Sequence, residues 1–307
     1  MKQLLRWALN LPRYGPVALK DPQSTVEVWL EGPEAPRDVT ANNVVASLRP
    51  FTVGIMLGES APPPSEEQKP RLCFRDRSSQ RLLGVLHLSP AGAIALPGYR
   101  FCLFEIKSCE NYCVSRLQMR AYDLREQWRA ERRQHRNPHN FRMSHEGIRC
   151  SHAFYICPRP VVLVTVEHGV SGNMFPMDLI GPTDSPWFSM ALRLTSPAAE
   201  LMRQSRRMAL ASVPFSYKEF AYRLGEHHRK ASIDWNSLPF PFEPSPQFHL
   251  PVAKAALRTR EVQVEECRTV GSHMLFLTSL VSDTHSEQAR EKQLFHAFYG
   301  TRHSPKE

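Results

Sequence analysis

Residues 159–177 read Arg159-Pro-Val-Val-Leu-Val-Thr-Val-Glu-His-Gly-Val-Ser-Gly-Asn-Met-Phe-Pro-Met177. Within them, residues 160–166 form a continuous apolar and β-branched run, which is typical of a buried strand. Residues 167–173 contain two glycines and predict a turn, and a second extended run covers residues 174–180. This part of the chain therefore predicts two strands joined by a short turn.

The sequence that follows adds further strands and two short helices. Ser196 and Pro197 predict the start of one helix, because serine caps helices and proline is tolerated at the first helical position. A second short helix is predicted over residues 217–224. Strands are predicted over residues 187–193, 207–213, 253–267 and 273–282, the last two joined by a turn at residues 270–272. Many strands with few helices favour a β-barrel over a parallel α/β sheet.

The first half of the chain is also mainly β. Strands are predicted over residues 26–30, 52–57, 81–88 and 99–106, with a polar, proline-rich loop at residues 61–67. A long helix is predicted over residues 113–135 and ends at Asn137-Pro138. The polar, loop-like segment 137–149 places a boundary between a domain of residues 1–150 and a domain of residues 151–307.

The long helix carries two competing signals. Seven arginines lie on its outer faces, against Asp123, Glu126 and Glu131. They would suit nucleic acid, but no RNA-binding motif accompanies them. We favour a solvated face with paired charges, or a contact with an acidic surface in a dimer. We therefore expect no nucleic-acid partner. Its predicted apolar stripe consists of Leu117, Tyr122 (or Ala121), Leu124 and Trp128.

Composition narrows the class of protein. The chain has 307 residues, 42 % of them hydrophobic, which is enough for a core of ordinary size. No apolar run approaches the roughly 18–20 residues that a membrane span needs, so no membrane association is expected. The formal net charge is +9, which favours anionic ligands such as nucleotide phosphates.

The cysteines and the N-terminal residues favour certain cellular compartments for the protein. Seven cysteines, an odd number without a framework, favour a reducing compartment, and we expect a cytoplasmic protein. The first 20 residues lack acids, which also suits a mitochondrial transit peptide, although serine is absent there. Cys109, Cys113, Cys150 and Cys157 are spaced too loosely for a structural zinc knuckle, and no metal site is expected.

Four pieces of the second half resemble, in their order and spacing, the flavin-reductase-like family of FMN-binding split β-barrels. They look like the family's opening strand (residues 159–166), its Asn-x-x-Pro flavin loop (171–177), the strand and turn before its capped helix (189–196) and its Gly-Asp-His signature (271–273). Ser272 replaces the aspartate of that signature, and Met177-Asp178 departs from the usual flavin loop. The resemblance runs from Pro158 to His303.

The resemblance implies a fold class and a function. The expected class is mainly β with α (α+β): an FMN-binding split β-barrel in the C-terminal half, preceded by a β-rich domain with one long basic helix. The implied function is oxidoreduction, with hydride passing from NADH or NADPH through bound FMN, preferred over FAD, to an unknown acceptor. The sequence has no Gly-x-Gly-x-x-Gly loop, so the nicotinamide would bind transiently on the flavin. The alternatives are a non-catalytic flavoprotein and a partner-binding protein that uses the first domain and its basic helix.

The resemblance also implies a set of site residues. The isoalloxazine ring would be lined by backbone groups of Asn173, Met174, Phe175, Pro176 and Met177, with Ser189 on the next strand. Arg193, Thr195 and Ser196 would hold the phosphate, as a helix N-terminus beside an arginine is a natural anion site. Lys230 would reach the flavin, and His273 would lie near the nicotinamide as the catalytic residue. The simpler alternatives are helix capping by Thr195 and Ser196, a surface ion pair for Arg193, a solvated loop for Lys230 and a structural His273.

A flavin ring on the rim of a small barrel needs a second surface to cover it. The resembling family uses a second subunit, so a homodimer is expected, but the first half of this chain is another candidate cover. Residues 49–56 echo residues 159–166. A degenerate second barrel in the first half is therefore an alternative to an unrelated β-rich domain.

Overall fold

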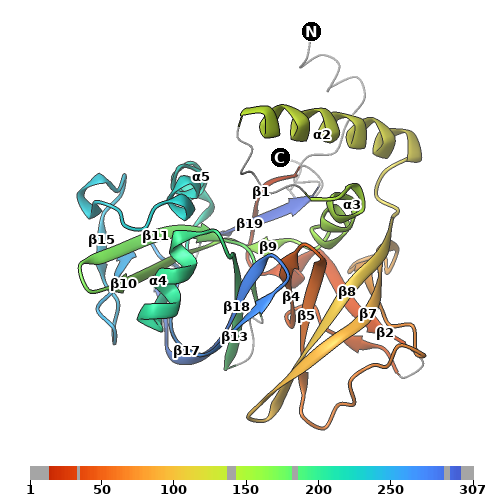
Figure 1. Cartoon of the computed structure of the whole chain (residues 1–307), viewed down its shortest axis with the longest axis horizontal. Coiled ribbons are helices and arrows are strands. Elements are labelled where there is room, and N and C mark those ends of the chain that lie inside the picture. Colours follow the sequence, from red (N-terminus) through yellow and green to blue (C-terminus); the bar gives the residue numbers. More distant parts are fainter. Residues whose placement is uncertain (1–13, 33–34, 137–142, 182–185, 287–290, 299–307) are drawn as a thin grey trace.

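The computed structural model describes residues 14–32, 35–136, 143–181, 186–286 and 291–298. Its strands form two seven-stranded antiparallel sheets, a three-stranded sheet and a two-stranded hairpin. Figure 1 shows the two large sheets side by side, with the three-stranded sheet and two helices above them. Among the described residues, no helix has the length and apolar character to cross a membrane.

The second large sheet is the predicted split β-barrel. Its strand order is β11-β10-β14-β17-β18-β13-β12, and every neighbouring pair is antiparallel. Helix α4 (Pro197–Ser205) closes one side of its core, in which Phe175, Phe188 and Phe276 are fully buried. The expected fold class is confirmed. The strands are β10 (Val162–His168), β11 (Ser171–Met177), β12 (Ile180–Gly181), β13 (Trp187–Arg193), β14 (Arg207–Ser212), β17 (Arg258–Val270) and β18 (His273–His285).

The first large sheet repeats this topology. Its order is β3-β2-β6-β7-β8-β5-β4, again wholly antiparallel. Numbered along the chain within each sheet, the strands of both follow the order 2-1-5-6-7-4-3. The strands are β2 (Val26–Glu31), β3 (Arg37–Asp38), β4 (Asn43–Leu48), β5 (Phe51–Gly58), β6 (Arg71–Asp76), β7 (Leu82–Leu96) and β8 (Tyr99–Asn111).

The sequence echo does not align equivalent strands. Residues 49–56 lead into β5, the fourth strand of the first sheet along the chain. Residues 159–166 instead cover β9 and most of β10, and β10 is the first strand of the second sheet. The topological equivalent of β10 is β2. The first half contains a sheet with the strand order of the second, and the two sheets with their cores are called the first and second barrels below. The echo that suggested a second barrel compares strands at different positions.

The three-stranded sheet joins segments that are far apart in the sequence. Strand β19 (Gln293–Phe298) lies between β1 (Tyr14–Leu19) and β9 (Arg159–Pro160) and is antiparallel to both. Beside the second barrel, the insertion between β14 and β17 contains α5 (Lys218–Leu224), the 3-10 helix η3 (Gly225–Arg229) and the hairpin of β15 (Phe242–Pro244) and β16 (Pro251–Ala253).

The segment predicted to be a linker contains a helix. Residues 137–142 lie outside the described part, but α3 (His145–Phe154) follows where a loop was expected. The Ser144 hydroxyl accepts a hydrogen bond from the Gly147 N–H, which caps the helix. Ala153 and Phe154 then pack into the core of the first sheet. The loop prediction was wrong because a local cap and tertiary packing outweigh the polar composition.

Helix α2 (Arg116–Arg136) ends within one residue of its predicted C-terminal bound, but of the predicted apolar stripe only Tyr122 is buried. Tyr122 is buried against His152 of α3 and Phe298 of β19. Leu117 and Leu124, in contrast, are 77 % and 66 % exposed. Figure 1 shows why: α2 runs across the top of the molecule, and only part of it meets other elements.

Candidate functional site

A cavity of about 750 Å³ lies where α4 begins. Its walls come from the chain after β11, from β13 and the turn that follows it, from η3, from the start of β18, and from Leu48 at the end of β4. Six residues predicted from the sequence line it: Pro176, Met177, Arg193, Thr195, Ser196 and His273. The cavity therefore brings together residues that span nearly a hundred positions of the second half, together with one residue of the first.

The remaining predicted residues do not line this cavity. Met174 and Phe175 are buried in the two cores on either side of the second sheet. Ser189 is fully buried and donates its hydroxyl hydrogen bond to the Gly181 carbonyl at 2.8 Å. Lys230 is exposed, just beyond η3.

Asn173 does not line the cavity, but its hydrogen bonds hold part of the cavity wall in place. It is fully buried, and its Nδ2 donates to the carbonyls of His227 at 3.0 Å and Lys230 at 2.8 Å. These two bonds fasten η3 to β11. Because η3 carries His228 and Arg229, which do line the cavity, Asn173 positions two side chains that the sequence analysis did not single out as site residues.

The cavity is rich in basic side chains. Arg193 and Arg229 both line it, and burial together with the Arg229 charge lowers the pKa of Arg193. His273 also lines it, and burial and the Arg193 charge lower its pKa to about 4, so its ring is neutral at pH 7. Two arginines that repel each other across a cavity favour an anion between them.

The start of α4 adds to this anion preference. Ser196 precedes the helix in an extended conformation, but its hydroxyl donates to the His228 carbonyl at 2.8 Å. The prediction that Ser196 caps the helix through its side chain was wrong, because η3 lies close enough to accept that hydrogen bond. The positive end of the helix dipole therefore faces a cavity lined by Thr195 and Ser196, without a side-chain cap.

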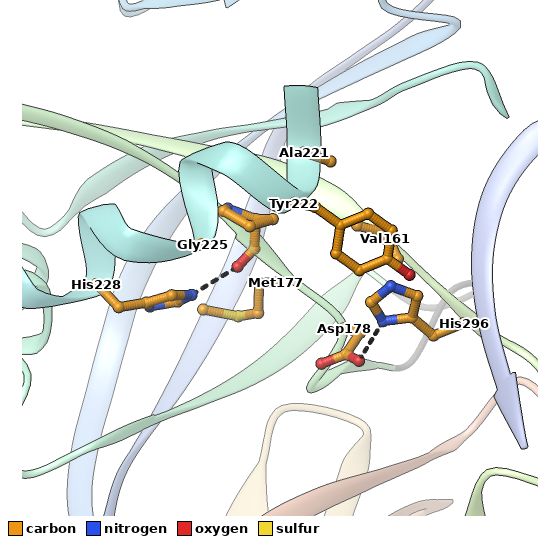
Figure 2. Close-up of a pocket in the computed structure, with 9 residues that line it drawn as sticks. Val161, Met177, Asp178, Ala221, Tyr222, Gly225, His228 and His296 are labelled. Carbon is orange, nitrogen blue, oxygen red and sulfur yellow. Dashed lines mark hydrogen bonds and ion pairs between the residues drawn. The ribbon is translucent and has the colours of Figure 1, made fainter. Parts of the chain in front are cut away.

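A second pocket, of about 220 Å³, adjoins the first and shares Met177, Asp178 and His228 with it. Figure 2 shows Asp178 and His296 facing each other in this pocket, with the ring of Tyr222 beside His296. The two rings are stacked at 5.4 Å between centroids. His228 closes the other side, and its Nε2 lies 2.8 Å from the Pro176 carbonyl oxygen.

Asp178, His296 and Tyr14 form a compact hydrogen-bonded group. The Nδ1 atom of His296 lies 2.8 Å from Oδ2 of Asp178, and the Tyr14 hydroxyl donates to the same oxygen at 2.6 Å. Burial opposes ionisation of Asp178, but hydrogen bonds and charge from His296 and hydrogen bonds from Tyr14 and Tyr155 outweigh it, so its pKa is lowered. Burial and Asp178 in turn raise the pKa of Tyr14, which stays protonated.

Sequence reasoning missed this group. Asp178 was visible only as a departure from the flavin loop, and neither Tyr14 nor His296 belongs to a motif. The three residues come from β1, from the chain after β11, and from β19, which are brought together by the three-stranded sheet. No local pattern signals a contact between residues 164 positions apart.

Of the four cysteines whose spacing was compared with a zinc site, two lie close together in the structure. The structure brings Cys109 and Cys150 together with Glu146, and their possible ligand atoms lie within 4.8 Å of one another. Hydrogen bonding with Cys109 and burial raise the pKa of Cys150, which is therefore a neutral thiol at pH 7. Cys157 is buried elsewhere, with its thiol 3.9 Å from the Val26 carbonyl.

No family model matches the chain, and no curated protein matches it. Solved structures do match over about half of it. An FMN-binding protein from Thermus thermophilus with bound p-hydroxybenzaldehyde is 23% identical, with 47% of this chain and 82% of that chain covered and a TM-score of 0.40.

Two reductases give similar values. The NADH:FAD oxidoreductase SgcE6 of Streptomyces globisporus C-1027 is 17% identical, with 50% of this chain and 89% of that chain covered and a TM-score of 0.43. BorF, the flavin reductase component of a bacterial two-component tryptophan halogenase, is 16% identical, with 50% and 94% covered and a TM-score of 0.43. One part of the chain is similar in fold to flavin reductases and FMN-binding proteins.

Proposed function

We propose that this protein binds FMN in the 750 Å³ cavity and is a flavin-dependent oxidoreductase that accepts hydride from NADH or NADPH. The observation that carries the proposal is the pairing of Arg193 and Arg229 with the open N-terminus of α4 at one cavity. Its volume lies within the usual range of cofactor sites. A phosphate-bearing ligand matches these donors, and the apolar wall suits an aromatic ring.

Different residues of the cavity would contact different parts of FMN. Arg193, Thr195 and Ser196, with Arg229, would hold the phosphate of FMN, whereas Met177 and its neighbours would contact the ring. A bound flavin supplies the redox chemistry, because it accepts hydride and passes on electrons. The protein has to bind it, orient it and exclude water, which explains why the cavity lining carries no evident nucleophile.

His273 is proposed as the residue nearest the nicotinamide. It lines the cavity beside Arg193 and is neutral at pH 7, with its pKa lowered to about 4. A neutral imidazole donates or accepts a hydrogen bond without adding a further positive charge. Its Nδ1 lies 3.4 Å from the Leu48 backbone nitrogen, which donates to it, and 2.9 Å from the Ser272 hydroxyl oxygen.

Purified protein tests the proposal directly. Mildly purified protein should be yellow, with flavin absorbance near roughly 370 and 450 nm, and anaerobic NADH or NADPH should bleach the longer-wavelength band. Colourless protein that takes up no added FMN would contradict flavin binding.

The non-catalytic alternative is favoured by a different observation. On α2, Leu117, Leu124 and Trp128 are exposed among basic residues, which is a surface that a partner protein would cover. A protein of this kind would retain FMN, but its oxidised spectrum would not change when either nicotinamide nucleotide is added under anaerobic conditions.

A further inference from the structure

We infer that the first barrel is the in-chain partner of the second: it closes the FMN cavity in cis and has lost the equivalent cavity of its own. One chain would then bind one FMN without a second subunit. The identity of the ligand rests on the function proposed above, but the closure in cis rests on the topology and contacts of the two barrels.

The two barrels correspond residue by residue around the cavity. In the second barrel Arg193 of β13 pairs with His273 of β18, and the next N–H, from Leu194, donates to the Ser272 carbonyl at 3.1 Å. In the first barrel Gly58 of β5 pairs with Tyr99 of β8, and the Glu59 N–H donates to the Gly98 carbonyl, also at 3.1 Å. Arg193 is therefore equivalent to Gly58, and His273 to Tyr99.

The barrels also pack through equivalent elements. A shared core joins β4, β5, β7 and β8 of the first barrel to β13, β17 and β18 of the second, with Phe101, Ala191 and Leu275 buried in it. Strand β12 meets β4, its own equivalent, since a Cβ at Gly181 would lie 3.1 Å from the Asn43 carbonyl oxygen. An interface in which the same surfaces meet is what a two-fold dimer has, here within one chain. Figure 1 shows β4 and β5 beside β13 and β18 at this junction.

The turn between β4 and β5 covers the cavity. Leu48 lines it, and the Arg49 carbonyl accepts the Ser272 N–H at 2.9 Å. The turn approaches so closely at Gly271, whose φ is +52°, that a Cβ there would lie 2.3 Å from the Arg49 oxygen. The first barrel is thus docked on the turn that carries His273.

The equivalent place in the first barrel has lost its anion-binding groups. Gly58 and Glu59 stand where the second barrel has Arg193 and Leu194, which removes a positive charge and adds a negative one. Residues 59–70, all of them described, contain no helix where the second barrel has α4. Without an arginine and a helix N-terminus, this position does not favour a phosphate.

Mass and stoichiometry test the inference on the whole protein. Light scattering should give a monomer near the chain mass of 35.2 kDa with and without FMN. Titration should saturate at one FMN for each chain. A dimer that releases FMN on dilution, or two FMN for each chain, would overturn the inference.

An engineered cross-link tests closure in cis independently of flavin. The hydroxyl oxygens of Ser47 and Ser272 lie 3.4 Å apart, so Ser47→Cys combined with Ser272→Cys places two thiols at the junction. Oxidation should give a disulfide bond within one chain, seen in gel electrophoresis without reductant as a monomer band that migrates faster. The two single variants control for the seven native cysteines. A covalent dimer, or no cross-link specific to the double variant, would refute closure in cis.

A substitution in the first barrel tests whether this barrel contributes to FMN binding. Leu48→Asp should weaken FMN binding at least tenfold while the protein stays monomeric, because it places a carboxylate in an anion site. The matched control Leu117→Asp changes an exposed leucine of α2, away from the cavity, and should bind FMN as the parent does. Equal affinities for the two variants would overturn the role of Leu48. If the parent itself binds no FMN, the proposed function fails, whereas the cross-link still decides closure.

Discussion

At the scale of single residues, Asn173 shows how a motif residue can serve a site without facing it. Both hydrogen atoms of its amide are used to hold the carbonyls of His227 and Lys230, so its side chain fixes η3 against β11. The residues that face the cavity, His228 and Arg229, are placed by this anchor. Asn173 is therefore a positioning residue in this structure.

The proposed contact between Arg193 and the phosphate gives a prediction at this scale. Arg193→Ala should weaken FMN binding by about 1.5–3 kcal/mol, the range for losing a charge-assisted hydrogen bond. Riboflavin, which lacks the phosphate, should bind the variant and the parent equally when measured by fluorescence titration. Arg203→Ala, at the other end of α4, is the matched control and should change neither affinity. If Arg193→Ala loses riboflavin and FMN alike, Arg193 has a structural role instead.

Asp178 gives a second prediction, on stability. Asp178→Asn should lower the free energy of unfolding by about 1.5–3 kcal/mol at pH 7, because it removes a partly buried carboxylate that is hydrogen-bonded to Tyr14 and His296. The folded-state pKa of Asp178 is lowered, so its contribution is complete above the unfolded-state value of about 3.9 and is lost as pH falls through the folded-state value.

Denaturant unfolding at several pH values measures this contribution. The difference between parent and variant should be constant near neutral pH and shrink in acid. The exposed pair of Glu200 and Arg203 supplies the control, because Glu200→Gln should have little effect at any of these pH values. A difference that does not depend on pH would show that the loss comes from packing alone.

At the scale of elements, α2 is a helix whose sequence periodicity did not match its buried face. The apolar residues at Leu117 and Leu124 follow helical spacing, but the neighbouring elements α3 and β19 meet the helix at Tyr122. Helical periodicity indicates that a helix is amphipathic. It does not indicate which part of the apolar face another element will cover.

A pair of substitutions on α2 tests this assignment. Tyr122→Ala should destabilise the protein by about 3 kcal/mol, since it leaves a cavity between α2, α3 and β19. Leu124→Ala, two residues away, should stay within about 0.5 kcal/mol of the parent because its side chain is in solvent. Thermal or denaturant unfolding measures both. Similar losses for the two variants would mean that Leu124 is covered in solution, which would locate a partner surface.

At the scale of the whole molecule, the two barrels share a core and should unfold as one unit. Phe101 belongs to β8 of the first barrel and packs in the core that also contains Ala191 and Leu275 of the second. The three-stranded sheet adds a second connection, because β19 from the C-terminus pairs with β1. Neither barrel is complete without the other at this junction.

A core substitution tests this cooperativity. Phe101→Ala should cost about 3–5 kcal/mol, the range for removing a buried aromatic ring. Amide hydrogen exchange that occurs through global unfolding should report the same loss of free energy for β10 in the second barrel and for β2 in the first. Exchange that accelerates in β2 alone would show that the barrels open separately.

The sequence by itself determined most elements of the second barrel. The strand predicted over residues 187–193 coincides with β13, and the helix predicted to start at Ser196-Pro197 is α4. Both signals are local: alternating or continuous β-branched residues, and a serine followed by proline. From them and their order, the barrel class and the turn that places Arg193 beside the start of α4 could be predicted.

Only the tertiary structure decided what surrounds that turn. Leu48 lines the larger pocket, His296 the smaller one and Asp178 both, and Tyr14 is hydrogen-bonded to Asp178. None of these residues belongs to a motif, and strand pairing or barrel packing brings them together across more than a hundred residues. The match in strand order between the two barrels could likewise not be predicted from the sequence, because strand order depends on which strands pair and not on the residues of any one strand. Local patterns report the conformation of a segment and the face it buries, whereas contacts between distant segments depend on the packing of the whole chain.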